Sequence, residues 1–154
     1  MKALDELAAD HRVFEQLLGA LEGELARPSH GAPSRVERLL RALLQGLDAH
    51  EAAEDIVCGA RGKAAHKREH ADFEDLREVL DFVLDSGVEA NFTSLRATLQ
   101  HLDERLRAHF RLEEESVWPV LRRRPPRLSP KAAAALAGHR RALARLKDEV
   151  LAPA

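Results

Sequence analysis

The stretch AHEAAED, residues 49–55, decides how the rest of this chain is interpreted. A counterpart, AHFRLEE, begins 59 residues later at residues 108–114, and both follow the pattern A-H-x-x-x-E-(D/E). The same offset relates His11 to His70, so each unit places its two histidines 39 residues apart. The chain is therefore predicted to hold two copies of a helical hairpin, which together make a four-helix bundle with both motifs facing one interior.

Apolar residues outside these motifs recur at steps of three and four, as on the buried face of an amphipathic helix. No segment alternates like a β-strand, so the predicted fold is all-α, an up-down-up-down four-helix bundle with a short extra C-terminal helix. Ser34 is expected to cap the second helix, Gly59 to Gly62 to end it, and Pro119 to distort the last turn of the fourth. The predicted helices span residues 4–26, 34–58, 63–85, 89–121 and 131–151.

Length and composition fit one domain, with a bundle over residues 1–121 and a basic, proline-rich connector and C-terminal helix over 122–154 packing on it. No apolar run reaches the roughly 20 residues of a membrane span, and the N-terminus lacks a signal-peptide core. Cys58 is the only cysteine. A cytoplasmic protein is expected, with no nucleic-acid partner because acids and bases nearly balance at a net charge of -2.

The repeat places four histidines at one level of the bundle. Short loops make neighbouring helices antiparallel, and at about 1.5 Å per residue each of the four lies a similar distance from the same end. A residue four positions on is displaced by only about 40° around a helix, so Glu54 and Glu113 share the inward face with His50 and His109. Such a set is costly to bury without partners. Imidazole and carboxylate together suit iron, manganese or zinc, and two carboxylates favour two metal ions over one.

These residues resemble the hemerythrin-like (HHE cation-binding) domains over roughly residues 4–121. The resemblance implies two iron ions, bridged by an oxo or hydroxo group and by carboxylates. It also implies O2 or a related small molecule, such as peroxide or NO, as ligand. The implied metal ligands are His11, His50, Glu54, His70, His109 and Glu113. Oxygen-carrying members end with His-x-x-x-x-Asp, whereas this chain has Glu113 at the fourth position and Glu114 at the fifth. We favour Glu113, because Glu114 would lie about 140° from His109 on a straight helix. This departure favours sensing or handling of small molecules over simple O2 carriage.

Several residues keep two interpretations. His66, Glu51 and His139 are further candidate ligands or ordinary structural residues, and Cys58 is a buried apolar residue or a redox-sensitive thiol. Glu15 and Glu74, each four residues after a histidine, are expected at the rim of the site. Aromatic residues near the ligand layer are core residues or a wall that controls access of small gases: Phe14, Phe73, Phe110 and Trp118.

The leading functional hypothesis is a non-haem di-iron protein, monomer or homodimer, that binds or senses a small molecule. The rivals are a di-iron oxidase or peroxide-consuming enzyme, an iron-storage or iron-sensing module, and a metal-free structural bundle. A binding protein is favoured over a dedicated enzyme, because no residue beyond the ligands has the character of a general base or nucleophile.

Overall fold

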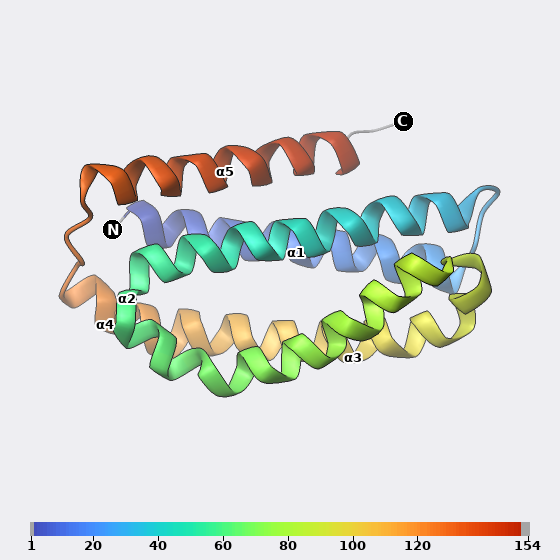
Figure 1. The fold of residues 1–154 in the computed structure, drawn as a ribbon, viewed down its shortest axis with the longest axis horizontal. Helices are drawn as coiled ribbons and strands as arrows, with labels where there is room; N and C mark the ends of the chain where they lie inside the picture. The colour runs from blue at the N-terminus through green and yellow to red at the C-terminus, as the bar shows by residue number, and fades with distance from the viewer. Residues whose placement is uncertain (1, 152–154) are drawn as a thin grey trace.

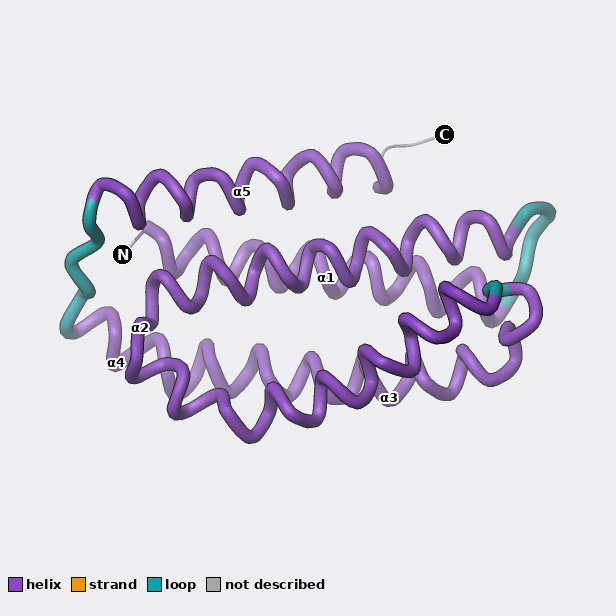
Figure 2. Tube along the Cα trace, viewed as in Figure 1, coloured by secondary structure: helices purple, strands orange, loops and turns teal. Residues whose placement is uncertain are grey.

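Four helical segments alternate in direction along the chain, so that each runs antiparallel to the next, and a fifth helix lies along one side of them (Figure 1). A computed structural model describes residues 2–151, with the backbone alone described for residues 60–72. Loops are short and lie at the two ends of the bundle (Figure 2). The elements in chain order are α1 (Lys2–Ala26), α2 (Ala32–Ser86), the 3-10 turn η1 (Glu89–Asn91), α3 (Phe92–Leu112), the π-helical turn η2 (Glu113–Val117), α4 (Trp118–Arg123) and α5 (Pro130–Leu151).

The helix α2 contributes two of the four segments, because it bends sharply at Gly59. This glycine has φ 60 and ψ -156, a non-helical conformation that strains any residue with a Cβ atom. The chain therefore turns back there without a separate loop, and the expected interruption between the second and third segments lies at its first glycine. The third segment ends as expected at Ser86 and Gly87, where Gly87 again has a positive φ of 101.

The start of α2 differs from the sequence prediction. Ser34 does not cap it, because the helix already begins at Ala32 and its cap position is Gly31, which has a left-handed conformation with φ 75. Pro33 occupies the first turn, where the missing N–H group costs nothing. The prediction that Ser34 caps this helix was wrong because the helix begins two residues earlier, directly after Gly31.

The fourth segment is irregular near Pro119, as expected. After α3 the chain forms a π-helical turn at Glu113–Val117 and then the short α4. Pro119 has no N–H group to donate, and its ring crowds the preceding turn. A π-helical turn relieves this crowding by widening the helix, and such turns are frequent at functional sites. Here the widened turn begins at Glu113, one of the candidate ligands.

The packed interior has two parts. The larger cluster runs along α1, α2 and α3 and includes Phe14, Leu43, Leu99 and, from α5, Leu143. The smaller cluster lies toward the end that carries the N-terminus and contains Leu4, Leu7, Ala53, Val57, Trp118 and Leu136. Along α1, His11 falls between Leu7 of the smaller cluster and Phe14 of the larger one. The candidate ligands therefore occupy a polar layer between two apolar ones.

The prediction of an all-α bundle with an additional C-terminal helix is confirmed. The described residues contain no β-strand, and α5 packs against α2 and α1. Within residues 2–151, none of the helices combines the length and apolarity needed to cross a membrane.

Candidate metal centre

The polar layer is built from three helical segments that each present one turn of side chains inward. Four side chains in it, His11 from α1, His50 and Glu54 from α2, and Glu113 from η2, are buried, and one ligand atom from each lies within 4.8 Å of the others. His109 from α3 is 7% exposed and borders the same layer. The i, i+4 spacing of both His-x-x-x-Glu motifs therefore does what the sequence predicts and places each glutamate beside its histidine.

Short distances connect the layer across the helices. His11 Nε2 lies 3.1 Å from His50 Nε2, and His50 Nε2 lies 3.0 Å from Glu54 Oε1. Glu113 reaches both sides, with Oε2 3.1 Å from His11 Nε2 and Oε1 2.9 Å from His109 Nε2. One carboxylate thus faces two imidazoles with different oxygens, which is the arrangement of a bridging ligand.

The outer nitrogens of His11 and His50 determine what their inner nitrogens can do. His11 Nδ1 lies 2.7 Å from Glu114 Oε1, and His50 Nδ1 lies 3.3 Å from Asp10 Oδ2. An ionised carboxylate only accepts hydrogen bonds, so each Nδ1 carries the proton. In the neutral imidazoles both Nε2 atoms then present lone pairs to each other across 3.1 Å. Only a positive species between them, a proton or a metal cation, makes this contact favourable.

Electrostatics in the metal-free layer agree with this requirement. Burial disfavours a charged imidazole, yet the attraction of Glu54 and the contact with Asp10 outweigh burial and raise the pKa of His50 to about 10. Burial also raises the pKa of Glu54 above its ordinary range, although His50 acts in the opposite direction. Without a metal the layer retains a proton on His50, which occupies the position where a cation would compensate the carboxylates.

A second ring of charges surrounds these carboxylates. Arg12 donates to both oxygens of Glu114, at 2.6 and 2.9 Å. Arg140, from α5, donates to Asp10 Oδ2 at 3.2 Å and lies 3.1 Å from Glu6. Groups that hydrogen-bond the outer nitrogen of a ligating histidine fix its ring and its tautomer. His11 and His50 therefore each have a carboxylate behind them and an arginine behind the carboxylate.

Aromatic side chains make the wall around the histidines. Phe110 stacks on His11 with ring centroids 3.9 Å apart, and Trp118 stacks on it at 4.9 Å. Phe14 meets His50 edge-on at 5.3 Å, and Phe73 meets His109 edge-on at 5.2 Å. These contacts leave the imidazoles few alternative orientations and keep the layer apolar on its flanks, so that its charges are weakly screened.

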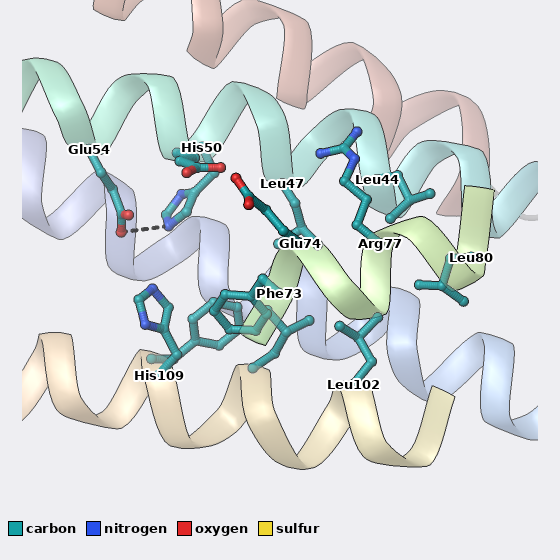
Figure 3. Close-up of a pocket in the computed structure, with 13 residues that line it drawn as sticks. Leu44, Leu47, His50, Glu54, Phe73, Glu74, Arg77, Leu80, Leu102 and His109 are labelled. Atoms are coloured by element: carbon teal, nitrogen blue, oxygen red, sulfur yellow. Dashed lines mark ion pairs between the residues drawn. The ribbon is translucent and has the colours of Figure 1, made fainter. Parts of the chain in front are cut away.

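A cavity of about 200 Å³ opens beside the polar layer. Figure 3 shows His50 and Glu54 from α2 facing His109 from α3, with Phe73 next to them. Leucines of α2 and α3 line it, and its charged side chains include Glu74 and Arg77. The cavity gives a small apolar molecule room next to the imidazoles and carboxylates.

The other candidate residues from the sequence differ in where they lie relative to the four-residue cluster. The side chains of His70 and His66 lie outside the described residues. Glu51 lines the cavity without joining the four-residue cluster. Glu15 pairs with Arg12, as expected of a rim group, and Glu74 lines the cavity. His139 is half-buried on α5 and outside the cluster. Burial raises the pKa of Cys58 to about 12, which makes it an unreactive neutral thiol.

The groups behind the histidines were not predicted from the sequence. Asp10 precedes His11 as Glu69 precedes His70, and this repeated acid was the available signal for an orienting group. Glu114 was set aside on straight-helix geometry, and in the widened η2 turn it reaches the outer nitrogen of His11 while Glu113 remains inside. No local pattern points to Arg140, which lies 130 residues from its partner Asp10.

The sequence model of the hemerythrin HHE cation-binding domain matches residues 2–117 and, in a second overlapping match, residues 61–151. This chain belongs to the hemerythrin HHE cation-binding family. The domain of this family binds metal cations, and the cluster of His11, His50, Glu54 and Glu113 is a group able to hold one in this hemerythrin-like chain. The search of curated proteins and the search of solved structures each gave no match.

Proposed function

We propose that this hemerythrin-like chain is a non-haem di-iron protein that binds or senses O2 or a related small molecule such as peroxide or NO. The observation that carries the proposal is the convergence of His11, His50, Glu54 and Glu113, buried side chains whose ligand atoms lie within 4.8 Å of one another, with the Nε2 atoms of the two histidines 3.1 Å apart. The donor set of imidazole and carboxylate, without thiolate, suits iron and disfavours a structural zinc site of the cysteine type.

Glu113 supports two metal positions rather than one. Its two oxygens face different histidines, His11 and His109, from opposite sides of the layer. If two irons are bound, the imidazoles of His11, His50, His70 and His109 and the carboxylates of Glu54 and Glu113 would hold them. A di-iron centre supplies one- and two-electron redox chemistry with O2, peroxide or NO when it is bound.

The protein's own contribution is orientation and access. Carboxylates behind His11 and His50 direct the inner nitrogens of both rings into the layer. The cavity beside His50, Glu54 and His109 gives an uncharged small molecule room next to the candidate ligands.

Metal content and an absorption spectrum of aerobically purified, iron-replete protein test this proposal. We expect about two irons per chain, the content of a dinuclear site, and a near-ultraviolet band of an oxo-bridged centre, both lost in His50→Ala. His101→Ala is the matched control, because His101 is an exposed histidine of α3. The reduced, iron-loaded protein should change its spectrum with O2, NO or peroxide. Stoichiometric zinc or an absence of metal would contradict the proposal.

The size of the cavity favours one second candidate, a di-iron oxidase or peroxide-consuming enzyme. A buried apolar space of about 150 Å³ already admits benzene, and the cavity here, at about 200 Å³, exceeds what a diatomic gas requires. Consumption of hydrogen peroxide or of a small organic hydroperoxide at catalytic protein concentration would identify the enzyme. Binding without turnover would favour a protein that senses or carries the small molecule.

A further inference from the structure

The fifth helix contacts the surroundings of the candidate metal centre through Arg140. Arg140 projects from α5 toward the first turns of α1, where its Nε lies 3.1 Å from Glu6 and its Nη1 donates to Asp10 Oδ2 at 3.2 Å. The Asp10 side chain is 7% exposed, and the Arg140 side chain is 25% exposed. This ion pair is therefore shielded from solvent, and its loss would leave a buried carboxylate without its compensating cation.

The same oxygen of Asp10 makes the contact with the histidine. His50 Nδ1 lies 3.3 Å from Oδ2, the atom that also accepts the hydrogen bond from Arg140. Arg140 thus sets where this oxygen lies, and the oxygen sets the plane of the imidazole ring. A metal at Nε2 makes the Nδ1–H group more acidic, so its hydrogen bond to a fixed carboxylate strengthens when the metal binds.

We propose that Arg140 is a positioning residue for the metal ligand His50, acting through Asp10, so that docking of α5 is part of the metal site. This inference rests on the proposed function. In this inference α5 does not only cover the bundle but also supplies the side chain that positions Asp10. When α5 is in place the ring of His50 is held for metal binding, and when α5 leaves the bundle Asp10 loses the group that fixes it.

Packing places α5 well for this role. Leu136 belongs to the apolar cluster on one side of the polar layer, and Leu143 belongs to the cluster on the other side. Arg140 lies between these two leucines along the helix. The two apolar contacts therefore fix the position of α5 along the bundle axis. A shift of α5 by one turn would break the contact between Arg140 and Asp10.

The experiment is a double-mutant cycle on metal affinity, measured by competition with a chelator, using Arg140→Gln, Asp10→Asn and the double variant. We expect Arg140→Gln to weaken metal binding about 10-fold, near the lower end of losses for residues behind a metal ligand. The double variant should bind no more weakly than Asp10→Asn alone, because Arg140 acts through Asp10. Arg141→Gln, which removes the same charge from an exposed position of the same helix, should bind like the unaltered protein.

Two results would overturn the inference: an unchanged affinity in Arg140→Gln, or losses that simply add in the double variant. Should Arg140→Gln fail to fold, Arg140→Lys replaces it in the cycle, since a lysine retains the charge but has only one ammonium to serve both Glu6 and Asp10. A second readout uses cobalt-loaded protein, in which the His50 Nδ1–H resonance should exchange faster with solvent in Arg140→Gln than in Arg141→Gln. Equal exchange rates would also overturn it.

His50→Ala separates this inference from the proposed function. If His50→Ala still takes up metal with unchanged affinity, the proposed function fails. If His50→Ala loses metal while Arg140→Gln retains it fully, the metal site stands and only the role of Arg140 fails.

Discussion

His11 and His50 face each other across one site, but the groups behind them differ in burial. Behind His11, Glu114 is 30% exposed and its partner Arg12 is 54% exposed. Behind His50, Asp10 is 7% exposed and its partner Arg140 is 25% exposed. The first chain of contacts joins α1 to the turn η2 at the surface of the bundle, whereas the second runs under α5. Both sets of contacts join distant parts of the chain, but the one behind His11 lies at the surface and the one behind His50 is shielded from solvent.

This difference predicts different sensitivities. An exposed ion pair contributes little and is screened by salt, and water can replace Arg12 as a partner of Glu114. A shielded pair is costly to break because the remaining charge is then neither paired nor solvated by water. The orientation of His50 should therefore depend on the integrity of the whole fold, whereas that of His11 should tolerate substitutions behind it.

The largest expected effect comes from the glutamate that both sides share. Glu113→Ala removes the only described carboxylate that faces both His11 and His109, so metal content should fall close to zero. Glu114→Ala, one residue on, should retain the metal with reduced affinity. Elemental analysis of the two variants, purified in parallel, makes the measurement. Equal metal loss in both would show that inner and outer carboxylates are not distinct.

A smaller effect is expected when the outer carboxylates are neutralised one at a time. Asp10→Asn should weaken metal binding by roughly 10- to 100-fold, the usual range for groups that orient a ligand. Glu114→Gln should weaken it less, because Glu114 is partly exposed. Chelator competition on both variants provides the comparison. A greater loss in Glu114→Gln would reverse the order proposed for the two sides.

Salt should then separate the two arginines. At about 1 M salt the screening length falls to about 3 Å, from about 10 Å at 0.1 M. The loss of metal affinity in Arg12→Gln should disappear at the higher concentration, since the pair it removes is screened there in the unaltered protein too. The loss in Arg140→Gln should persist, because that pair is shielded. Chelator titrations at the two salt concentrations, corrected for the chelator's own salt dependence, measure both losses. If burial has no role, the losses in Arg12→Gln and Arg140→Gln should change with salt by the same factor.

The smallest effect on the metal is expected from packing beneath α5. A Cβ atom at Gly46 would lie 3.1 Å from Leu143 Cδ1 and 2.9 Å from Phe14 Cε1. Gly46→Ala should therefore lower the free energy of unfolding by about 1–3 kcal/mol, and it should reduce metal affinity only slightly, on the His50 side.

Gly19→Ala is the control for this packing test, because a Cβ atom at Gly19 meets nothing within 4 Å. Its removal of a helical glycine should stabilise the protein by up to about 1 kcal/mol. Thermal unfolding of the metal-free proteins measures both changes. A stable Gly46→Ala variant would show that α5 moves outward without cost.

The bundle itself could be predicted from sequence because its rules are local. Apolar residues at steps of three and four identify the helices, and glycines mark where the chain must adopt a positive φ, as at Gly59 and Gly87. The prediction that Ser34 caps the second helix failed for a reason that is also local, because the helix begins directly after Gly31. The pairing of His50 with Glu54, and of His109 with Glu113, follows from helical periodicity alone.

The sequence by itself determined the helices, the repeat and the residues able to meet in one polar layer, because helical spacing converts sequence position directly into direction. Only the tertiary structure decided which groups stand behind those residues. Glu114 reaches His11 because Pro119 and the π-helical turn change the direction of the helix. Arg140 reaches Asp10 because two apolar clusters fix the height of α5. Contacts between distant segments depend on how helices pack against one another, and that is a property of the whole folded chain.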